Sequence, residues 1–215
     1  MDTDAAETCD RPKPLYLFEV ADLLDHVVQR ARCSPKPLIV GLDGRSGVGK
    51  STLARVLADS LHTAVIEGDD FYAGGTELRA DTAESRAKAC IDWTRQRAVL
   101  EAFAGGRVAV WRSFDWDAFD GRLRDEPSML EPRPIVILEG VYSARPELAD
   151  LLDLCVVLTA PDEVRIARLA AREGEIGPWE TQWHEAEEYY FEHIMPLSRF
   201  DVVMASGHDI TGCPL

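Results

Sequence analysis

The chain has 215 residues, of which 46% are hydrophobic and 28% are charged, and its formal net charge is −15. That length and hydrophobic content suffice for one α/β core, whereas the acidic balance excludes a nucleic-acid partner, because phosphate backbones bind basic surfaces. No apolar run approaches the roughly 20 residues of a membrane span, and the acidic first residues lack the apolar stretch of a secretory signal. The five cysteines are scattered, without a C-x-x-C spacing, so we expect reduced thiols and a cytoplasmic protein.

Apolar runs alternate with helical patterns along the chain. We expect residues 1–14 to be disordered and residues 15–215 to form a single domain. The expected helices are residues 15–31, 51–61, 92–104, 146–152, 161–172 and 179–195. The expected strands are residues 37–42, 62–67, 107–111, 135–138, 154–158 and 201–204. Residues 73–88 are expected to form a loop that turns helical near Ala83, and residues 112–134 an irregular excursion over the active-site edge. This alternation predicts an α/β fold with a doubly wound, mainly parallel sheet and helices on both faces.

A phosphate-binding loop follows the first long apolar run. Gly44-Arg45-Ser46-Gly47-Val48-Gly49-Lys50-Ser51 has the form G-x-x-x-x-G-K-S between a predicted strand and a predicted helix. Its glycines allow successive N–H groups to point at phosphate oxygens, and the helix adds its own unpaired N–H groups and dipole. Lys50 is expected to reach the outer phosphates, and the Ser51 hydroxyl to ligate magnesium. From this segment we expect ATP to bind at Gly44, Ser46, Gly47, Val48, Gly49, Lys50, Ser51 and Thr52.

Carboxylates stand at the ends of two later predicted strands. Asp69 and Asp70 follow the strand of residues 62–67, and Glu139 ends the strand of residues 135–138. In open α/β sheets ligands bind at the carboxyl ends of the strands. One carboxylate beside a triphosphate can accept the proton of an attacking hydroxyl, and others can hold magnesium. Alternatively, the two aspartates cap a turn, and Glu139 is an acid at the protein surface.

Three arginines share one face of the helix at residues 161–172. Arg165, Arg168 and Arg172 are spaced i, i+3 and i+7. They are expected to close over the triphosphate as part of a lid near residues 165–178, because guanidinium groups fit phosphate oxygens in a bidentate way. An equally weighted alternative is a solvated face that is paired with neighbouring acids.

Aromatic residues and aspartates alternate between residues 111 and 120. Phe114, Asp115 and Trp116 belong to this segment, and Asp92-Trp93 is a smaller candidate of the same kind. Aromatic rings can stack on a base while carboxylates bind sugar hydroxyls. The alternatives are rings packed in the core and, for Asp92, a helix cap. We interpret the stripe of Trp179, Trp183, Tyr190 and Ile194 as core, and His184 as a surface residue.

These motifs together resemble the uridine kinase-like group of P-loop kinases, which also includes phosphoribulokinase and bacterial pantothenate kinase relatives. The phosphate loop, Asp69-Asp70-Phe71-Tyr72, the strand that ends in Glu139-Gly140 and the arginine helix carry the resemblance, which covers about residues 38–204. It implies a P-loop kinase fold, ATP, Mg²⁺ and transfer of the γ-phosphoryl group to a hydroxyl of a small-molecule acceptor.

The resemblance also implies roles for individual residues. The catalytic residues would be Asp69, Lys50, Arg168 and Arg172. The metal ligands would be Ser51, Asp69 and Glu139. Arg165 would join the ATP site. The acceptor would contact Asp70, Tyr72, Asp92, Phe114, Asp115 and Trp116. The chain departs from the family where Asp117-Ala118-Phe119 lacks a base-contacting histidine.

The sequence therefore favours an ATP-dependent kinase for a nucleoside or nucleoside-like metabolite, with no nucleic-acid or membrane partner. A nucleoside other than uridine or cytidine, a vitamin precursor, a sugar or a biosynthetic intermediate stays open as the acceptor, and so does a homo-oligomer. One alternative function is a nucleotide-binding regulatory switch without kinase activity. Another is a nucleoside monophosphate kinase, whose acceptor phosphate would need Arg79, Arg86, Arg95 or Arg97.

Overall fold

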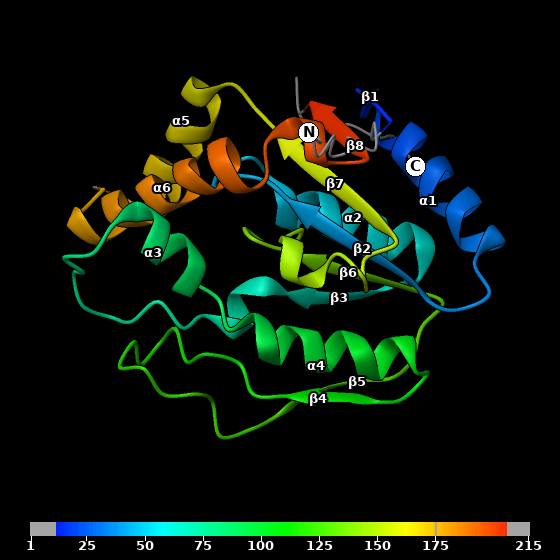
Figure 1. Ribbon diagram of the computed structural model, residues 1–215, viewed down its shortest axis with the longest axis horizontal. Coiled ribbons are helices and arrows are strands. Elements are labelled where there is room, and N and C mark those ends of the chain that lie inside the picture. Colours follow the sequence, from blue (N-terminus) through cyan, green and yellow to red (C-terminus); the bar gives the residue numbers. More distant parts are fainter. Residues whose placement is uncertain (1–11, 175, 206–215) are drawn as a thin grey trace, which may run out of the picture.

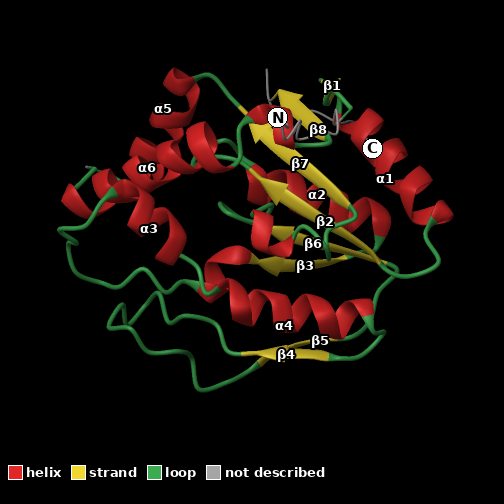
Figure 2. Cartoon of the chain, viewed as in Figure 1, coloured by secondary structure: helices red, strands yellow, loops and turns green. Residues whose placement is uncertain are grey.

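A six-stranded parallel sheet forms the centre of the computed structural model, which describes residues 12–174 and 176–205 (Figures 1 and 2). The strand order is β1-β8-β7-β2-β6-β3, and every paired neighbour is parallel. These strands are β1 (Leu15–Leu17), β2 (Leu38–Asp43), β3 (Ala64–Glu67), β6 (Ile135–Glu139), β7 (Leu154–Thr159) and β8 (Val202–Ala205). The α-helices are α1 (Val20–Cys33), α2 (Lys50–Leu61), α3 (Ala83–Ala89), α4 (Trp93–Ala104), α5 (Asp162–Glu173) and α6 (Pro178–Tyr189).

Two hydrophobic cores lie on opposite faces of this sheet. Successive side chains of a strand point to opposite faces, and β2 shows the result. Leu38 and Val40 join one cluster with residues of α1 and α2, whereas Ile39 joins the other with residues of α4 and α6. All six residues of β2 are buried, as a central parallel strand requires. The predicted doubly wound α/β fold is confirmed.

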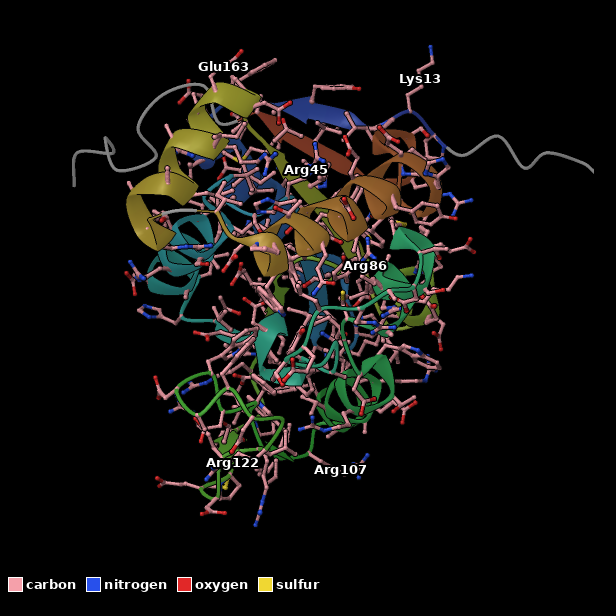
Figure 3. The ribbon with its side chains drawn as sticks, turned by 90° about the vertical axis from the view of Figure 1, so that its left-hand side faces the viewer. Lys13, Arg45, Arg86, Arg107, Arg122 and Glu163 are labelled. Carbon is pink, nitrogen blue, oxygen red and sulfur yellow. The ribbon has the colours of Figure 1, made fainter. Side chains whose placement is uncertain are left out.

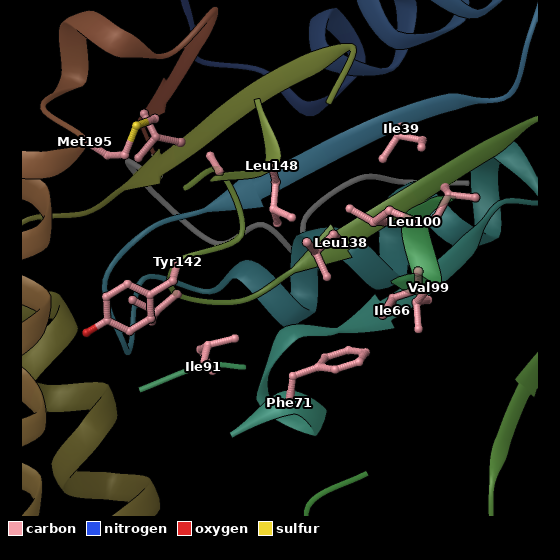
Figure 4. Close-up of a cluster of buried hydrophobic side chains, with 14 of the residues drawn as sticks. Ile39, Ile66, Phe71, Ile91, Val99, Leu100, Leu138, Tyr142, Leu148 and Met195 are labelled. Atoms are coloured by element: carbon pink, nitrogen blue, oxygen red, sulfur yellow. The ribbon is translucent and has the colours of Figure 1, made fainter. Parts of the chain in front are cut away.

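The core beneath β3 and β6 is packed against α4. Figure 4 shows Val99 and Leu100 of α4 beside Ile66 and Leu138 of the sheet, with Phe71 below them. Leu100 is 0% exposed, so its side chain is surrounded on all sides.

Leu100→Ala is expected to lower the free energy of unfolding by about 2–5 kcal/mol, because it removes buried apolar contacts and leaves a cavity. Urea unfolding measures this change. Glu101→Ala is the matched control, since Glu101 is exposed on the same helix and forms a surface ion pair with Arg97 at 3.0 Å. A change below about 1 kcal/mol for Leu100→Ala would contradict this packing.

The carboxyl ends of the parallel strands share one edge of the sheet. In Figure 1 the arrowheads of β2, β3 and β7 point to the side where α3, α5 and α6 gather. On either side of β2 the neighbours are β6 and β7. The crevice outside the carboxyl ends of such strands is where ligands bind in this kind of fold.

Several predicted elements differ from the structure. The helix predicted from Leu15 is wrong at its start, because residues 15–17 form β1 beside β8 and the helix begins at Val20. The apolar spacing of residues 15–17 is compatible with a helix and with a strand. They form a strand because the edge of β8 offers backbone groups for parallel pairing. The predicted helix at residues 146–152 is only the 3₁₀ turn η2 (Pro146–Leu148), and the one at 179–195 continues beyond α6 as the π-helical turn η3 (Tyr190–Ile194).

The excursion after α4 contains more structure than predicted. Within residues 112–134, β5 (Ser128–Leu130) pairs with β4 (Ala109–Trp111), the strand predicted at residues 107–111, as a separate antiparallel sheet. The helix expected near Ala83 is confirmed as α3. Most of the segment predicted to be disordered lies outside the described residues. Within the part of the chain that is described, no helix is long and apolar enough to cross a membrane.

Candidate active site

The phosphate loop connects β2 to α2 and is shaped by its glycines. Gly44, Gly47 and Gly49 have φ values of 146°, 83° and 102°, a region that side chains other than glycine rarely adopt. Space is equally restrictive, because a Cβ on Gly44 would lie 2.4 Å from the Leu158 carbonyl oxygen, and one on Gly47 would lie 2.7 Å from the Arg165 carbonyl oxygen. The loop therefore lies tightly against β7 and α5.

A buried carboxylate supports the loop from behind. Asp43, which is 0% exposed, accepts hydrogen bonds from the Gly44 N–H at 2.8 Å and the Tyr142 N–H at 3.1 Å. Its other oxygen accepts from the Ala144 N–H at 2.9 Å and the Tyr190 hydroxyl at 2.8 Å. Burial raises the pKa of Asp43 from 3.8 to about 6, although these hydrogen bonds act in the opposite direction.

The Asp43 carboxyl is therefore expected to titrate near pH 6 in the folded protein. Between pH 3.8 and about 6 the folded state binds this proton more tightly than the unfolded chain. The free energy of unfolding that this bound proton adds is therefore fully present below pH 3.8 and is lost as the pH rises through about 6. Carbon-13 NMR of aspartate carboxyls checks this, with Asp43→Asn giving the assignment. Tyr190→Phe removes a donor and is expected to raise the pKa of Asp43 further, and an unchanged or lower value would contradict the assignment.

Lys50, Ser51 and Glu139 meet at the start of α2. The Lys50 ammonium donates to the Arg45 carbonyl oxygen at 3.2 Å, and the Ser51 hydroxyl donates to Glu139 Oε1 at 3.3 Å. Burial raises the pKa of Glu139 to about 7, while the charge of Lys50 lowers it. A carboxylate that is desolvated beside a hydroxyl suits a cation that takes oxygen ligands.

These residues fit magnesium rather than a metal held by protein alone. Among the residues described, no group of three or more His, Cys, Asp or Glu side chains is arranged to hold a metal ion. Magnesium is usually bound by one or two carboxylates together with substrate phosphates and water. The pair of Ser51 and Glu139 beside a phosphate loop provides such a partial set of ligands.

The two aspartates predicted at the end of β3 lie on the 3₁₀ turn η1 (Gly68–Phe71). The Asp69 side chain lines the pocket and is surrounded by the pocket walls. The resulting desolvation raises the pKa of Asp69, whereas the positive charges of Lys50 and Arg172 lower it. Asp70 accepts a hydrogen bond from the indole of Trp111 at 2.6 Å. The Asp69 carboxylate therefore interacts electrostatically with Lys50 and Arg172.

One pocket of about 580 Å³ brings these groups together. Its phosphate-loop wall consists of Ser46, Gly47, Gly49, Lys50, Ser51 and Thr52. Its acids are Glu67, Asp69, Asp70, Glu139 and Glu180, and its arginines are Arg168 and Arg172. Its aromatic residues are Trp116, Trp179, Trp183 and His184. The pocket thus combines a phosphate-binding end with carboxylates and indole rings.

Two arginines of α5 donate hydrogen bonds to backbone carbonyl groups of the phosphate loop. Arg165 is buried and donates to the Ser46 carbonyl oxygen and to Asp162 Oδ1, both at 3.3 Å. Arg168 donates to the Val48 carbonyl oxygen at 3.0 Å and also lines the pocket. Arg165, in contrast, does not line it. The pairing of Arg165 with Asp162 agrees with the alternative of neighbouring acids, whereas closure of the arginines over a triphosphate stays a prediction.

Several residues predicted to contact ligands are placed elsewhere. Gly44 and Val48 belong to the loop but not to the pocket lining. Tyr72 and Phe114 are buried, and the Tyr72 hydroxyl donates to the Gly75 carbonyl oxygen. Of the predicted acceptor residues, the structure brings only Asp70 and Trp116 into the pocket.

The remaining two acids of that set stabilise local backbone. Asp92 is the N-cap of α4 and accepts from the Arg95 N–H at 3.2 Å. Asp115 accepts from the Ala118 N–H at 3.1 Å in a turn. Such capping is the ordinary role of aspartate at these positions.

Comparison with known proteins identifies the family. The AAA domain family matches residues 40–188. A uridine kinase of Alkaliphilus metalliredigens is 30% identical over 150 residues, which are 65% of this chain and 70% of that protein. The chain belongs to the uridine kinase-like group of P-loop kinases. A uridine kinase of Ligilactobacillus salivarius is 27% identical over 80% of this chain and 86% of its own length.

Solved structures agree on the fold of this uridine kinase-like chain. The structure of a possible uridine kinase from Bacillus stearothermophilus has a TM-score of 0.63 at 22% sequence identity. The likeness covers 86% of this chain and 98% of the other. At that identity the comparison supports the P-loop kinase architecture and not the choice of substrate.

The aromatic wall of this uridine kinase-like pocket was missed by sequence reasoning. Trp179 and Trp183, interpreted there as core, are only partly buried and line the pocket, with stacked rings 5.8 Å apart. His184, interpreted as a surface residue, lines it too. Helical spacing shows that the two tryptophans share a face of α6, but not that this face borders a cavity. Asp43 and Glu187 were also missed, although an acid four residues after Trp183, on the same stripe, was an available signal.

Proposed function

We propose that this kinase transfers the γ-phosphoryl group of ATP, in the presence of magnesium, to a hydroxyl group of a nucleoside or nucleoside-like small molecule. The observation that carries the proposal is that Lys50, Ser51, Asp69 and three indole rings line one pocket. Phosphoryl transfer depends mainly on positioning and charge neutralisation, and a pocket with these two ends can hold donor and acceptor in contact.

At the donor end, the loop N–H groups and Lys50 bind the β- and γ-phosphates. Ser51 and Glu139 hold magnesium, which neutralises charge on the phosphate oxygens when it is bound. Arg168 and Arg172, which also line the pocket, offset the charge that spreads over the transferring group.

At the acceptor end, Asp69 orients the attacking hydroxyl and accepts its proton. Desolvation raises the pKa of Asp69, which brings it closer to the operating pH and makes the carboxylate a better general base. The side chains of Trp116, Trp179 and Trp183 provide flat apolar surfaces for a planar base. The curated relatives named uridine kinase support a nucleoside as the acceptor class.

A nucleoside monophosphate is a less suitable acceptor for this pocket. Three of the four arginines considered for its phosphate are paired with acids, Arg79 with Asp81, Arg86 with Glu185 and Arg97 with Asp150. The fourth, Arg95, donates to a backbone carbonyl. None of the four is among the residues that line the active-site pocket.

The test is a coupled assay of ADP formation across nucleosides, nucleoside monophosphates, sugars and pantothenate-like alcohols, with mass detection of the product. The expected result is ATP consumption that depends on an uncharged acceptor and yields its monophosphate. Slow hydrolysis that is independent of any acceptor would favour the regulatory switch. A preference for monophosphate acceptors would overturn the assignment of the acceptor class.

A further inference from the structure

A buried glutamate lies between the phosphate loop and the aromatic wall. Glu187 of α6 is 0% exposed. Its carboxylate accepts the Ser46 backbone N–H at 3.1 Å and also the Ser46 hydroxyl. The same carboxylate accepts the indole N–H of Trp183 at 2.5 Å. One side chain therefore holds a residue of the phosphate loop and a residue of the aromatic wall at the same time.

Burial of the Glu187 carboxylate costs folding free energy, so we expect the carboxylate to have a role at this position. Glu187 forms no ion pair within residues 12–174 and 176–205, and a buried charge without a cationic partner must be stabilised by hydrogen bonds. Here the donors are the three polar groups of Ser46 and Trp183. The negative charge also lies close enough to Asp69 to raise the pKa of that carboxyl.

Other contacts also connect α6 and the turn that follows it to the phosphate-loop region. The Arg45 guanidinium lies 3.6 Å from Glu188 of α6 and 3.9 Å from Asp162 of α5, and Figure 3 shows Arg45 between those two helices. Three residues beyond Glu187, the Tyr190 hydroxyl donates to Asp43, which immediately precedes the loop. The phosphate loop and the residue before it are therefore in contact with the helix that carries Trp183 at several points.

We propose that Glu187 is a positioning residue that couples the phosphate loop to the aromatic wall, so that nucleotide bound at the loop sets the orientation of Trp183. The inference rests on the proposed kinase function only for its kinetic consequence. Its structural part requires no turnover, because it concerns the link from Ser46 through Glu187 to Trp183.

Glu187→Gln breaks the link while preserving side-chain size. Of the two terminal oxygens, Oε2 lies nearer the Ser46 N–H, and Oε1 accepts from Trp183 and the Ser46 hydroxyl. A carboxamide replaces one of these oxygens by an NH₂ group. With the NH₂ group at the Oε1 position, the Trp183 N–H faces another donor and loses this acceptor. With the NH₂ group at the Oε2 position, the Ser46 N–H keeps only its longer hydrogen bond to Oε1, at 3.3 Å.

The direct test is fluorine-19 NMR of protein labelled with 5-fluorotryptophan, in which Trp183→Phe identifies the Trp183 signal. A non-hydrolysable ATP analogue with Mg²⁺ is expected to shift this signal in the unaltered protein, and the shift is expected to fall by at least about half in Glu187→Gln. Equal shifts in the two proteins, or no shift in the unaltered protein while calorimetry shows binding, would overturn the inference. Absence of nucleotide binding would overturn the proposed function as well.

Kinetics separate positioning from a purely structural role. Glu187→Gln is expected to raise the KM for ATP and the KM for the acceptor, each by about tenfold. A structural role alone would lower kcat through a smaller folded fraction and leave both KM values unchanged, a result that contradicts the proposal. Glu192→Gln is the matched control, because Glu192 is an exposed acid one turn further along and is expected to behave as the unaltered protein.

Discussion

Asp69→Asn is expected to lower kcat by about 10²–10⁴-fold, because an amide cannot accept the proton of the attacking hydroxyl. Asp69 lines the same pocket as Lys50 and the loop glycines. Its charge is not needed to hold the loop, so the dissociation constant of a non-hydrolysable ATP analogue is expected to change little. Steady-state kinetics and calorimetry together measure the two effects.

Asp120→Asn is a matched control for this substitution, since Asp120 is an aspartate paired with Arg122 in the excursion away from the pocket lining. Activity of Asp69→Asn within about tenfold of the unaltered enzyme would contradict the assignment of the general base. Loss of nucleotide binding in the same variant would instead assign Asp69 mainly to the donor half of the site.

Lys50→Met is expected to lower kcat/KM for ATP by about 10²–10³-fold, because it removes a preorganised cation from the phosphate-binding end. Lys50 is 8% exposed and is held by the Arg45 carbonyl oxygen at 3.2 Å, so its ammonium is already oriented before ATP arrives. The charge of Lys50 also lowers the pKa of Asp69 and of Glu139. Its loss is therefore expected to raise both pKa values.

The measurement is the pH dependence of kcat/KM, in which the acidic limb is expected to move to higher pH in Lys50→Met. Lys88→Met provides the control, because Lys88 is a solvent-exposed lysine that pairs with Glu84 four residues away. An acidic limb at unchanged pH would contradict the electrostatic effect of Lys50 on the pKa values of Asp69 and Glu139. An unchanged kcat/KM would contradict the assignment of Lys50 to phosphate binding.

The donor half of the site was predictable because its parts are local or lie at strand ends. The phosphate loop is one continuous segment whose glycines and lysine impose its shape and chemistry. Asp69 and Glu139 could be placed beside it, since parallel strands bring their carboxyl ends to one edge of a sheet.

The acceptor half was less predictable because its residues depend on packing between distant segments. Tyr72, Phe114 and Asp92 have side chains that suit a nucleoside site, yet here they pack or cap backbone. Trp179 and Trp183 follow a stripe typical of core residues, and the same stripe borders the pocket. Amphipathic spacing indicates which face of a helix is covered but not what covers it.

The sequence by itself determined a doubly wound α/β kinase with a phosphate loop and acids at the ends of neighbouring strands, because these features follow from short-range pattern and from the topology of parallel strands. Only the tertiary structure decided that α6 supplies the aromatic wall and that Glu187 lies against Ser46, 141 residues away along the chain. The burial of a charge depends on every segment that packs around it. No local pattern at Glu187 or Asp43 specifies those segments.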